Sequence, residues 1–368
     1  MVSLRIIIAP DSFKGSLSTI EVARAIEIGW RSVRENDEVT LAPQADGGEG
    51  TLDAIEAAIP DSVRHNIGLV TGPDARPTVG EWLELPGKVG VVELAQSSGL
   101  PLMKSPDALH ANSRGLGEVI RAALDAGINS LIVGVGGSAS TDGGAGALSA
   151  LGLQLLDTQD RAIEDGGSAL SQIARIDWSH VRTAPGGGVT ILTDVRSPLL
   201  GPHGSAAIFG PQKGATKTQI TILDLALKHF SNLLGGDTEF PGSGAAGGTA
   251  YGFATAWGAK IEPGADFIAR MHGFPEILQH ADLLITGEGS FDEQSLNGKV
   301  VGQLLAKASA LSLRSAVISG QIKVDTGVWQ SALVDIAGSV VAALENPTHW
   351  LTLAGAKAAH QLGSQLSK

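Results

Sequence analysis

The chain has 368 residues, of which 43% are hydrophobic but only 4% aromatic, so we expect a core built mainly from aliphatic side chains and alanine. A net charge of −12 argues against a nucleic-acid-binding protein, and the absence of cysteine excludes disulfides, thiolate metal sites and a cysteine nucleophile. No apolar run approaches the roughly 18 residues of a membrane span, and residues 1–10 show no signal-peptide pattern, which predicts a cytoplasmic protein without membrane contact. The 49 glycines lie among strand-like runs and favour an α/β enzyme.

The first predicted strand covers residues 4–10 and runs into a polar loop. Ser18 and Glu21 have the spacing of a capping box, which predicts a helix over 19–35. Three polar residues of the loop follow the strand directly: Asp11, Ser12 and Lys14. Ligands of open α/β sheets bind at this carboxyl edge, so Lys14 could grip a carboxylate or a phosphate, although a solvated lysine would leave the same pattern.

A second predicted strand, residues 38–42, leads into a glycine-rich loop ahead of a helix over 52–58. The loop carries two carboxylates, Asp46 and Glu49. Carboxylates so close together suggest that a cation or a substrate hydroxyl uses them. Alternatively, Asp46 caps backbone N–H groups and Glu49 lies in the first helical turn, where the helix dipole favours it.

The character of the sequence changes near Ser62. Three short alternating runs between Gly, Pro and Asp turns are typical of strands, at 65–70, 77–85 and 88–93. They predict an antiparallel sheet and the start of a new domain. Further on, Asn112 opens a small polar turn before a helix over 116–126, and Arg114 in this turn could reach an anion or lie at the surface.

Residues 130–152 run from a β-branched strand through a glycine-rich loop into a helix of small residues. The backbone N–H groups of such a loop can approach an anion closely, and the helix N-terminus adds partial positive charge, so this segment predicts a phosphate cradle. Its candidate ligand residues are Gly136, Gly137, Ser138, Ser140 and Thr141. Asp142 could cap the helix or hold a cation.

Two alternatives to a phosphate cradle follow from the same stretch. The spacing Gly134-x-Gly136-x-x-Ala139 fits a loose dinucleotide fingerprint, with Asp157 near its expected acidic position, although later paired glycines oppose it. A purely structural glycine turn also remains open. A Walker A loop is excluded because no lysine precedes the hydroxyl residues, and the chain has neither a Gly-x-Ser-x-Gly elbow nor an HExxH zinc motif.

The pattern of strand, polar turn and helix recurs later in the chain. A strand over 189–193 ends at Asp194, and Lys213 lies beside a glycine before a helix that starts near Thr218. A further buried strand, 282–286, leads to two more carboxylates, Glu288 and Asp292. Acidic residues and lysines at strand ends are the residue types that metal-nucleotide chemistry needs.

The tail of the chain matches the βαβ style of its first 60 residues, with a helix over 299–310, a strand over 315–319 and a final helix within 348–366. We therefore predict an α/β fold in which both chain ends, 1–62 and 277–368, form one Rossmann-like parallel-sheet domain. Residues 63–276 would form an inserted mixed α/β domain that carries the glycine-rich phosphate loop.

Taken together, these segments resemble the bacterial two-domain glycerate kinases. The matching motifs lie in the family order and span nearly the whole chain: 9–17, 46–51, 112–117, 136–144, 193–195, 210–214 and 286–289. One departure is Ser290, where members often have Arg. The resemblance implies ATP-dependent phosphorylation of D-glycerate with Mg²⁺, commonly at the 2-hydroxyl. We expect a monomer or a homodimer.

By hypothesis, the residues divide into four roles in that reaction. The catalytic set is Lys14, Asp46 and Asp194, with either aspartate accepting the hydroxyl proton. The substrate-binding set is Asp11, Ser12, Lys14, Asn112 and Arg114, with Lys14 and Arg114 on the glycerate carboxylate. The nucleotide-binding set is Gly136, Gly137, Ser138, Ser140, Thr141, Asp142, Lys213 and Glu288. Glu49 and Asp292 help to place Mg²⁺.

Other functions stay open at this point. The enzyme could phosphorylate the 3-hydroxyl of glycerate or act on a related small hydroxy acid. A Rossmann-type NAD-dependent hydroxy-acid dehydrogenase would bind NAD(H) in dependence on Asp157. A non-catalytic sugar-acid-binding protein would bind glycerate without turning over ATP.

Overall fold

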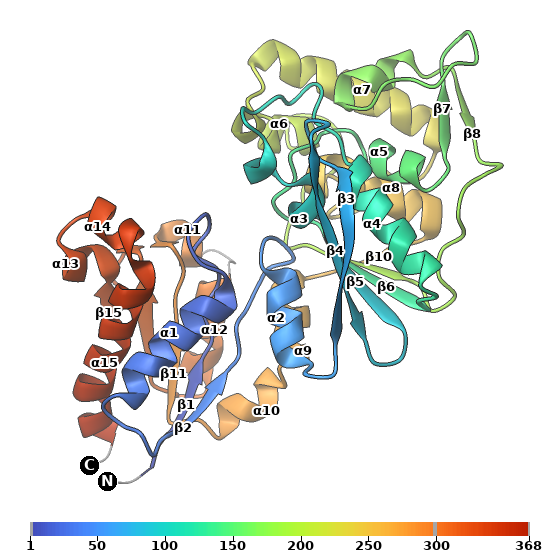
Figure 1. Cartoon of the computed structure of the whole chain (residues 1–368). Coiled ribbons are helices and arrows are strands. Elements are labelled where there is room, and N and C mark those ends of the chain that lie inside the picture. The colour runs from blue at the N-terminus through green and yellow to red at the C-terminus, as the bar shows by residue number, and fades with distance from the viewer. Residues whose placement is uncertain (1–2, 297–299, 367–368) are drawn as a thin grey trace. The chain divides into compact units, whose positions relative to one another are not determined.

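The computed structural model describes residues 3–296 and 300–366, which form two compact α/β units (Figure 1). Unit 1 combines residues within 1–46, 53–60 and 265–368, and unit 2 combines 47–52 with 61–264. Both ends of the described chain thus belong to unit 1. In these residues no helix is both long and apolar enough to cross a membrane.

Unit 1 is built on a five-stranded sheet in which every neighbouring pair of strands is parallel. In spatial order its strands are β15 (Trp329–Ala332), β13 (Ser315–Ser319), β11 (Leu283–Thr286), β1 (Arg5–Ile8) and β2 (Glu38–Leu41). Side chains alternate between the two faces, as a strand requires: Ile6 and Ile8 enter one hydrophobic cluster and Ile7 enters another. Helices therefore cover both faces of this sheet.

The first face of the unit 1 sheet is covered by helices from opposite ends of the chain, α1 (Thr19–Arg31) and α15 (Pro347–Leu366). The two helices lie side by side, blue against red in Figure 1. A Cβ on Gly29 would lie 1.9 Å from the carbonyl oxygen of Thr352, so only glycine allows the backbones to come this close. The second face is covered by α9 (Gly264–Met271), α10 (Phe274–Gln279) and α12 (Val300–Ala310).

The start of α1 confirms the predicted capping box, because the Ser18 hydroxyl accepts a hydrogen bond from the backbone N–H of Glu21 and the Glu21 carboxylate accepts one in return. The helix ends earlier than predicted, at Arg31 instead of residue 35. A buried ion pair between Arg34 and Asp37, with Nε and Oδ2 2.6 Å apart, fixes the following residues as a turn into β2.

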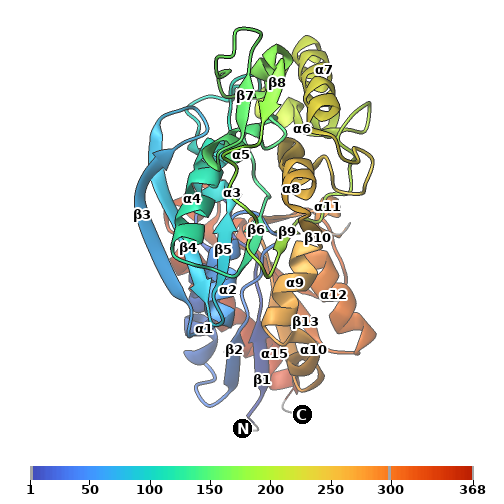
Figure 2. The ribbon, with the colours of Figure 1, turned by 90° about the vertical axis from the view of Figure 1, so that its right-hand side faces the viewer.

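Unit 2 holds a six-stranded mixed sheet, seen from edge to edge in Figure 2. Its spatial order is β10 (Lys260–Glu262), β9 (Val189–Leu192), β6 (Ser130–Gly134), β5 (Val89–Glu93), β4 (Pro77–Leu85) and β3 (Val63–Thr71). The antiparallel pairing predicted for β3, β4 and β5 is present. These strands do not form a separate sheet, because β5 pairs with β6 in parallel and so joins the rest of the unit.

The core of unit 2 lies between this sheet and four longer or well-buried helices. They are α4 (Arg114–Asp125), α5 (Ala145–Ala150), α7 (Lys217–Leu234) and α8 (Thr249–Trp257). Shorter helices of this unit are α3 (Leu94–Ser98) and α6 (Ser205–Phe209), and β7 (Gln154–Leu156) pairs with β8 (Arg175–Asp177) away from the main sheet. The helix α2 (Thr51–Ala58) has its first two residues in unit 2 and the rest in unit 1. The predicted helix over 299–310 is α12 from Val300 onward, and Lys299 lies outside the described residues.

Candidate active site

A pocket of about 400 Å³ lies at the carboxyl edge of the unit 1 sheet. The loops after β1, β2 and β11 supply most of its polar lining, which includes Asp11, Ser12, Lys14, Asp46, Glu288, Ser290 and Asp292. Ser16 and Gln321 also line the pocket. After β11 the chain forms the short strand β12 (Ser290–Phe291) and then the short helix α11 (Glu293–Leu296). The strand β12 pairs with β14 (Gln321–Ile322), which follows β13. The pocket thus gathers the unit 1 residues that the sequence assigns to catalysis, substrate binding and metal binding.

The electrostatics of the pocket centre on Asp11. Burial, and after it the neighbouring charge of Asp46, raise the pKa of this carboxyl to about 7, although the backbone N–H of Ser12 and the ammonium of Lys14 oppose the shift. The Ser12 N–H donates to Asp11 Oδ1 over 2.7 Å. A carboxyl group with such a pKa can accept a proton and release it again near neutral pH, as a general base must.

Two serine hydroxyls in the same pocket have no hydrogen-bond partner among the described residues. These are the buried Oγ atoms of Ser12 and Ser290. Buried hydroxyls are almost always hydrogen-bonded in folded proteins, so these two are suited to bind a polar ligand. Ser290 is the residue that departs from the family pattern, and it offers a short hydroxyl where an Arg would bring a long cation.

In unit 2, the loop after β6, the loop after β9 and the loop that holds Gly47 and Glu49 lie together at the carboxyl edge of the sheet. Gly136 and Gly137 follow β6, and Asp194 follows the neighbouring parallel strand β9. The N–H of Gly136 donates to the Gly47 carbonyl over 2.8 Å, and a Cβ on Gly137 would lie 3.5 Å from Glu49 Oε1. Of the predicted cradle only Gly137 is exposed and Gly136 half-buried, so their backbone is the part open to a ligand.

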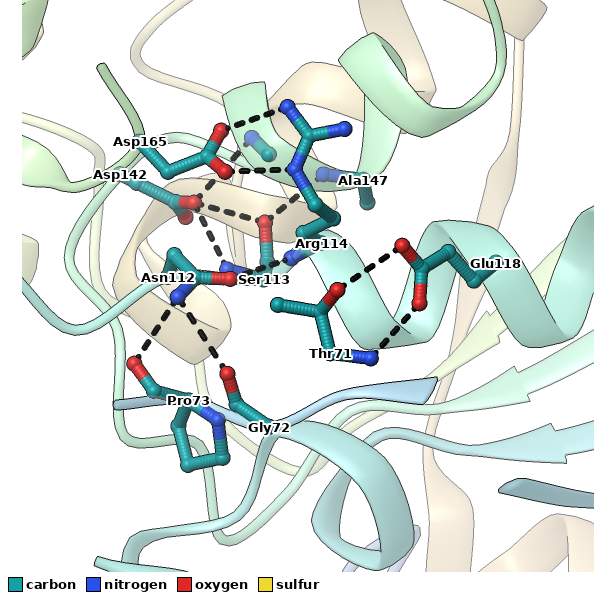
Figure 3. Close-up of polar contacts among 11 residues, drawn as sticks. Thr71, Gly72, Pro73, Asn112, Ser113, Arg114, Glu118, Asp142, Ala147 and Asp165 are labelled. Atoms are coloured by element: carbon teal, nitrogen blue, oxygen red, sulfur yellow. Dashed lines mark hydrogen bonds and ion pairs between the residues drawn. The ribbon is translucent and has the colours of Figure 1, made fainter. Parts of the chain in front are cut away.

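The carboxylate of Asp142 is buried beneath this loop and accepts five hydrogen bonds, of which Figure 3 shows the two from Ser113. Its donors are Ser113 N and Oγ, Ser140 Oγ, Gly144 N and Gly146 N, at 2.7–3.2 Å. The sequence left two roles open for Asp142, a helix cap or a cation ligand. The arrangement is that of a cap, because the hydrogen bonds join the loop to the first turn of α5 and to the start of α4.

Asn112 and Arg114, both predicted to bind substrate, make contacts within unit 2 (Figure 3). The Asn112 amide donates to the carbonyls of Gly72 and Pro73, and its oxygen accepts from the backbone N–H of Arg114. The Arg114 guanidinium forms a bidentate pair with Asp165, with Nε 2.5 Å and Nη2 3.0 Å from its oxygens, and this partner raises the pKa of Arg114. Asp165 lies 51 residues away and was not predicted from the sequence.

Lys213 is a buried cation under the glycine-rich loop. It ends the short 3-10 turn η3 (Pro211–Lys213), and its Nζ donates to Ser138 Oγ over 2.9 Å and to the Ser140 carbonyl over 2.5 Å. Burial lowers its pKa to about 7, while Asp142 opposes that change. The side chain therefore holds the loop from below and brings positive charge beneath Ser138.

Replacing Lys213 by Met should lower the free energy of unfolding at pH 7 by roughly 1–3 kcal/mol, because Ser138 and Ser140 lose a buried donor. The lowered pKa means that the folded state binds fewer protons than the unfolded state between about pH 7 and 10.5, so wild-type stability rises across this range. The difference in free energy of unfolding between wild type and variant should therefore be larger at pH 9 than at pH 7. Urea unfolding at both values measures the difference, and the exposed Lys217→Met is the control.

Among residues 3–296 and 300–366, no group of three or more His, Asp or Glu side chains is positioned to hold a metal ion. The predicted ligands Asp292 and Glu49 thus do not belong to a preformed cage of protein carboxylates. Mg²⁺ in kinases is commonly bound through one or two carboxylates together with the substrate phosphates. The acidic lining around Asp11 is compatible with that mode.

The dinucleotide interpretation of residues 134–157 is wrong. The loop runs through Gly143 and Gly144, both with positive φ, and the helix starts only at Ala145. The next strand, β7, pairs antiparallel with β8 instead of lying parallel to β6, so β6, α5 and β7 do not form the βαβ unit of a dinucleotide fingerprint. Asp157 accepts hydrogen bonds from its neighbours Gln159 and Arg161.

Comparisons of the sequence and of the fold with known proteins point to one family. The model of the glycerate kinase family matches residues 6–365. The chain is 40% identical to a glycerate kinase of Bacillus subtilis, over 92% of this chain and 90% of that protein, and 37% identical to a glycerate 2-kinase of Escherichia coli, over 93% and 91%. A crystal structure of a putative glycerate kinase 2 from Salmonella typhimurium superposes over the full length of both chains, with a TM-score of 0.82 and 34% identity. The chain is therefore a kinase that belongs to the glycerate kinase family.

Proposed function

We propose that this protein transfers the γ-phosphoryl group of ATP to the 2-hydroxyl of D-glycerate, giving 2-phosphoglycerate and ADP. The observation that carries this proposal is the chain-long relation to the family, which extends over residues 6–365. The choice of the 2-hydroxyl is supported by the Escherichia coli relative, whose name specifies a glycerate 2-kinase.

In the pocket of unit 1, we assign the glycerate carboxylate to Lys14 and its hydroxyl groups to Ser12 and Asp11. The substrate hydroxyl oxygen attacks the γ-phosphorus, the bond to the β-phosphate oxygen breaks, and the proton passes to a carboxylate. Asp11 and Asp46, which both line the pocket, are the candidates for this base in unit 1. Burial, together with the charge of Asp46, raises the pKa of Asp11 to about 7, so Asp11 can exchange a proton near neutral pH. Asp194 is the candidate in unit 2.

For the nucleotide, we assign the phosphates to the open backbone of Gly136 and Gly137 with the charge of Lys213 behind it. Phosphoryl transfer depends mainly on positioning and on neutralising phosphate charge, which backbone N–H groups and a buried cation can do. Asp292 in unit 1 and Glu49 in unit 2 are the groups we assign to Mg²⁺, whose charge would offset that of the phosphates. Asp142 and Asn112 act here as positioning residues.

The experiment is ADP release from Mg-ATP with D-glycerate, followed by addition of enolase to the product. We expect turnover whose product enolase consumes directly. A product that enolase consumes only after phosphoglycerate mutase is added would make the enzyme a 3-kinase. Absence of turnover with glycerate, but turnover with another small hydroxy acid such as tartronate, would overturn the choice of substrate.

A further inference from the structure

The pocket of unit 1 has a second half that is aliphatic. Three consecutive elements supply it: α13 (Leu333–Ala337), α14 (Val340–Glu345) and the first residue of α15. The side chains of this aliphatic wall are Leu333, Val334, Val340, Ala343, Leu344 and Pro347. Val340 is 46% exposed and Leu344 63% exposed, so neither is required to fill the core.

The aliphatic wall is held in place by hydrogen bonds of its own. The Ser339 hydroxyl caps α14 by accepting from the backbone N–H of Ala342 over 3.1 Å. The indole of Trp350 in α15 donates to the Ala342 carbonyl over 2.8 Å. The wall is thus a preformed surface, as is usual for small-molecule sites, and not a loose segment.

The charge and size of the pocket limit what can occupy the wall. Four carboxylates line the polar half, those of Asp11, Asp46, Glu288 and Asp292, against the single lysine Lys14. A bare triphosphate would be repelled by this excess of negative charge. A three-carbon hydroxy acid fits the polar half but has almost no apolar surface to lay against six aliphatic side chains.

We propose that the aliphatic wall binds the base of the nucleotide, and that Glu288, the carboxylate of the polar half that is assigned to neither glycerate nor Mg²⁺, accepts a hydrogen bond from the ribose hydroxyls. The base is the uncharged, flat part of ATP, and it gains free energy from leaving water for an apolar surface. Carboxylates beside a sheet edge hydrogen-bond ribose hydroxyls in other nucleotide-binding folds. This inference rests on the proposed kinase function and names the subsite for its donor.

A matched pair of variants on α14 tests the wall. Val340 lines the pocket, whereas its exposed neighbour Val341 does not, so Val340→Asn and Val341→Asn make the same chemical change inside and outside the site. We expect Val340→Asn and Leu344→Gln each to raise the KM for ATP and the Kd for ADP roughly tenfold. The KM for glycerate and the melting temperature should stay near wild type, and Val341→Asn should change neither nucleotide constant.

The outcomes separate this inference from the proposed function. If Val340→Asn raised the KM for the hydroxy acid and left ADP binding unchanged, the wall would belong to the acceptor and the inference would be wrong. If Val340→Asn and Val341→Asn bound ADP equally well, the wall would not contact the nucleotide. ADP binding by calorimetry needs no acceptor, so a wild type without glycerate turnover would overturn the proposed function and still leave the wall testable.

Discussion

Replacing Asp11 by Asn should lower kcat by roughly 10²–10⁴, the usual cost of losing a general base, while the KM for ATP changes little. The reason is that Asp11 combines a place in the unit 1 pocket with a pKa of about 7. Steady-state kinetics of the variant measure the effect, and the exposed Asp325→Asn is the control. If Asp11→Asn kept wild-type kcat while Asp46→Asn or Asp194→Asn lost it, the base would be that other aspartate.

The same substitution has a pH signature in both activity and stability. Wild-type kcat/KM should fall as the pH drops below about 7, because Asp11 becomes protonated, and this limb should vanish in Asp11→Asn. The folded-state pKa lies above its ordinary 3.8, so the folded state binds more protons than the unfolded state between these values, and ionisation of Asp11 costs stability as the pH rises. Asp11→Asn should therefore be more stable than wild type at pH 8, with a smaller difference at pH 5.

Replacing Asp142 by Ala should destabilise the protein by roughly 4 kcal/mol or more and lower its melting temperature by about 10 °C. The carboxylate accepts hydrogen bonds from three backbone N–H groups and two hydroxyls, and the buried N–H groups would be left without an acceptor. Asp165→Ala is the control, because its pair with Arg114 is partly exposed and should be worth about 1 kcal/mol.

Thermal unfolding of both variants decides what Asp142 does. A variant that melted like wild type but failed to bind ADP would show that Asp142 contacts the nucleotide, as the sequence analysis assigned it. A large loss of stability, with ADP affinity retained in the fraction that stays folded at low temperature, would establish the positioning role.

Much of the fold could be predicted from the sequence because its parallel strands are short aliphatic runs followed by polar turns. The strands at β1, β2, β11 and β13 and the capping box of α1 were found in this way, and the α/β class is confirmed. The strand β15 was missed, since its sequence Trp-Gln-Ser-Ala has neither a β-branched run nor strict alternation. The continuity of β5 with β6 was missed because a parallel pair has no local turn to reveal it. The domain boundaries assigned from the sequence stay a prediction.

The candidate site, too, has features that could be predicted from the sequence and features that could not. The rule that ligands bind at the carboxyl ends of strands selected the residues that line the unit 1 pocket, although their individual roles stay predictions. The sequence could not indicate which polar groups are hydrogen-bonded within the protein, because their partners are distant along the chain. Ser113 lies 29 residues from Asp142, and Asp165 lies 51 residues from Arg114. The aliphatic wall was missed because an apolar sequence pattern is the same for side chains that line a binding pocket and for side chains that pack in the core.

The pairing of α1 with α15 determines the order in which the nascent chain can fold. The sequence of unit 2 is complete at residue 264, so this unit can emerge from the ribosome and form its core before the last part of unit 1 has emerged. The apolar side chains of α1, including Val22, Ile26 and Trp30, lack the cover of α15 until residues 347–366 emerge. Until then this helix exposes an apolar surface that chaperones and other nascent chains can bind. Ribosomes that stall before residue 347 should therefore release products that aggregate through unit 1 although unit 2 is folded.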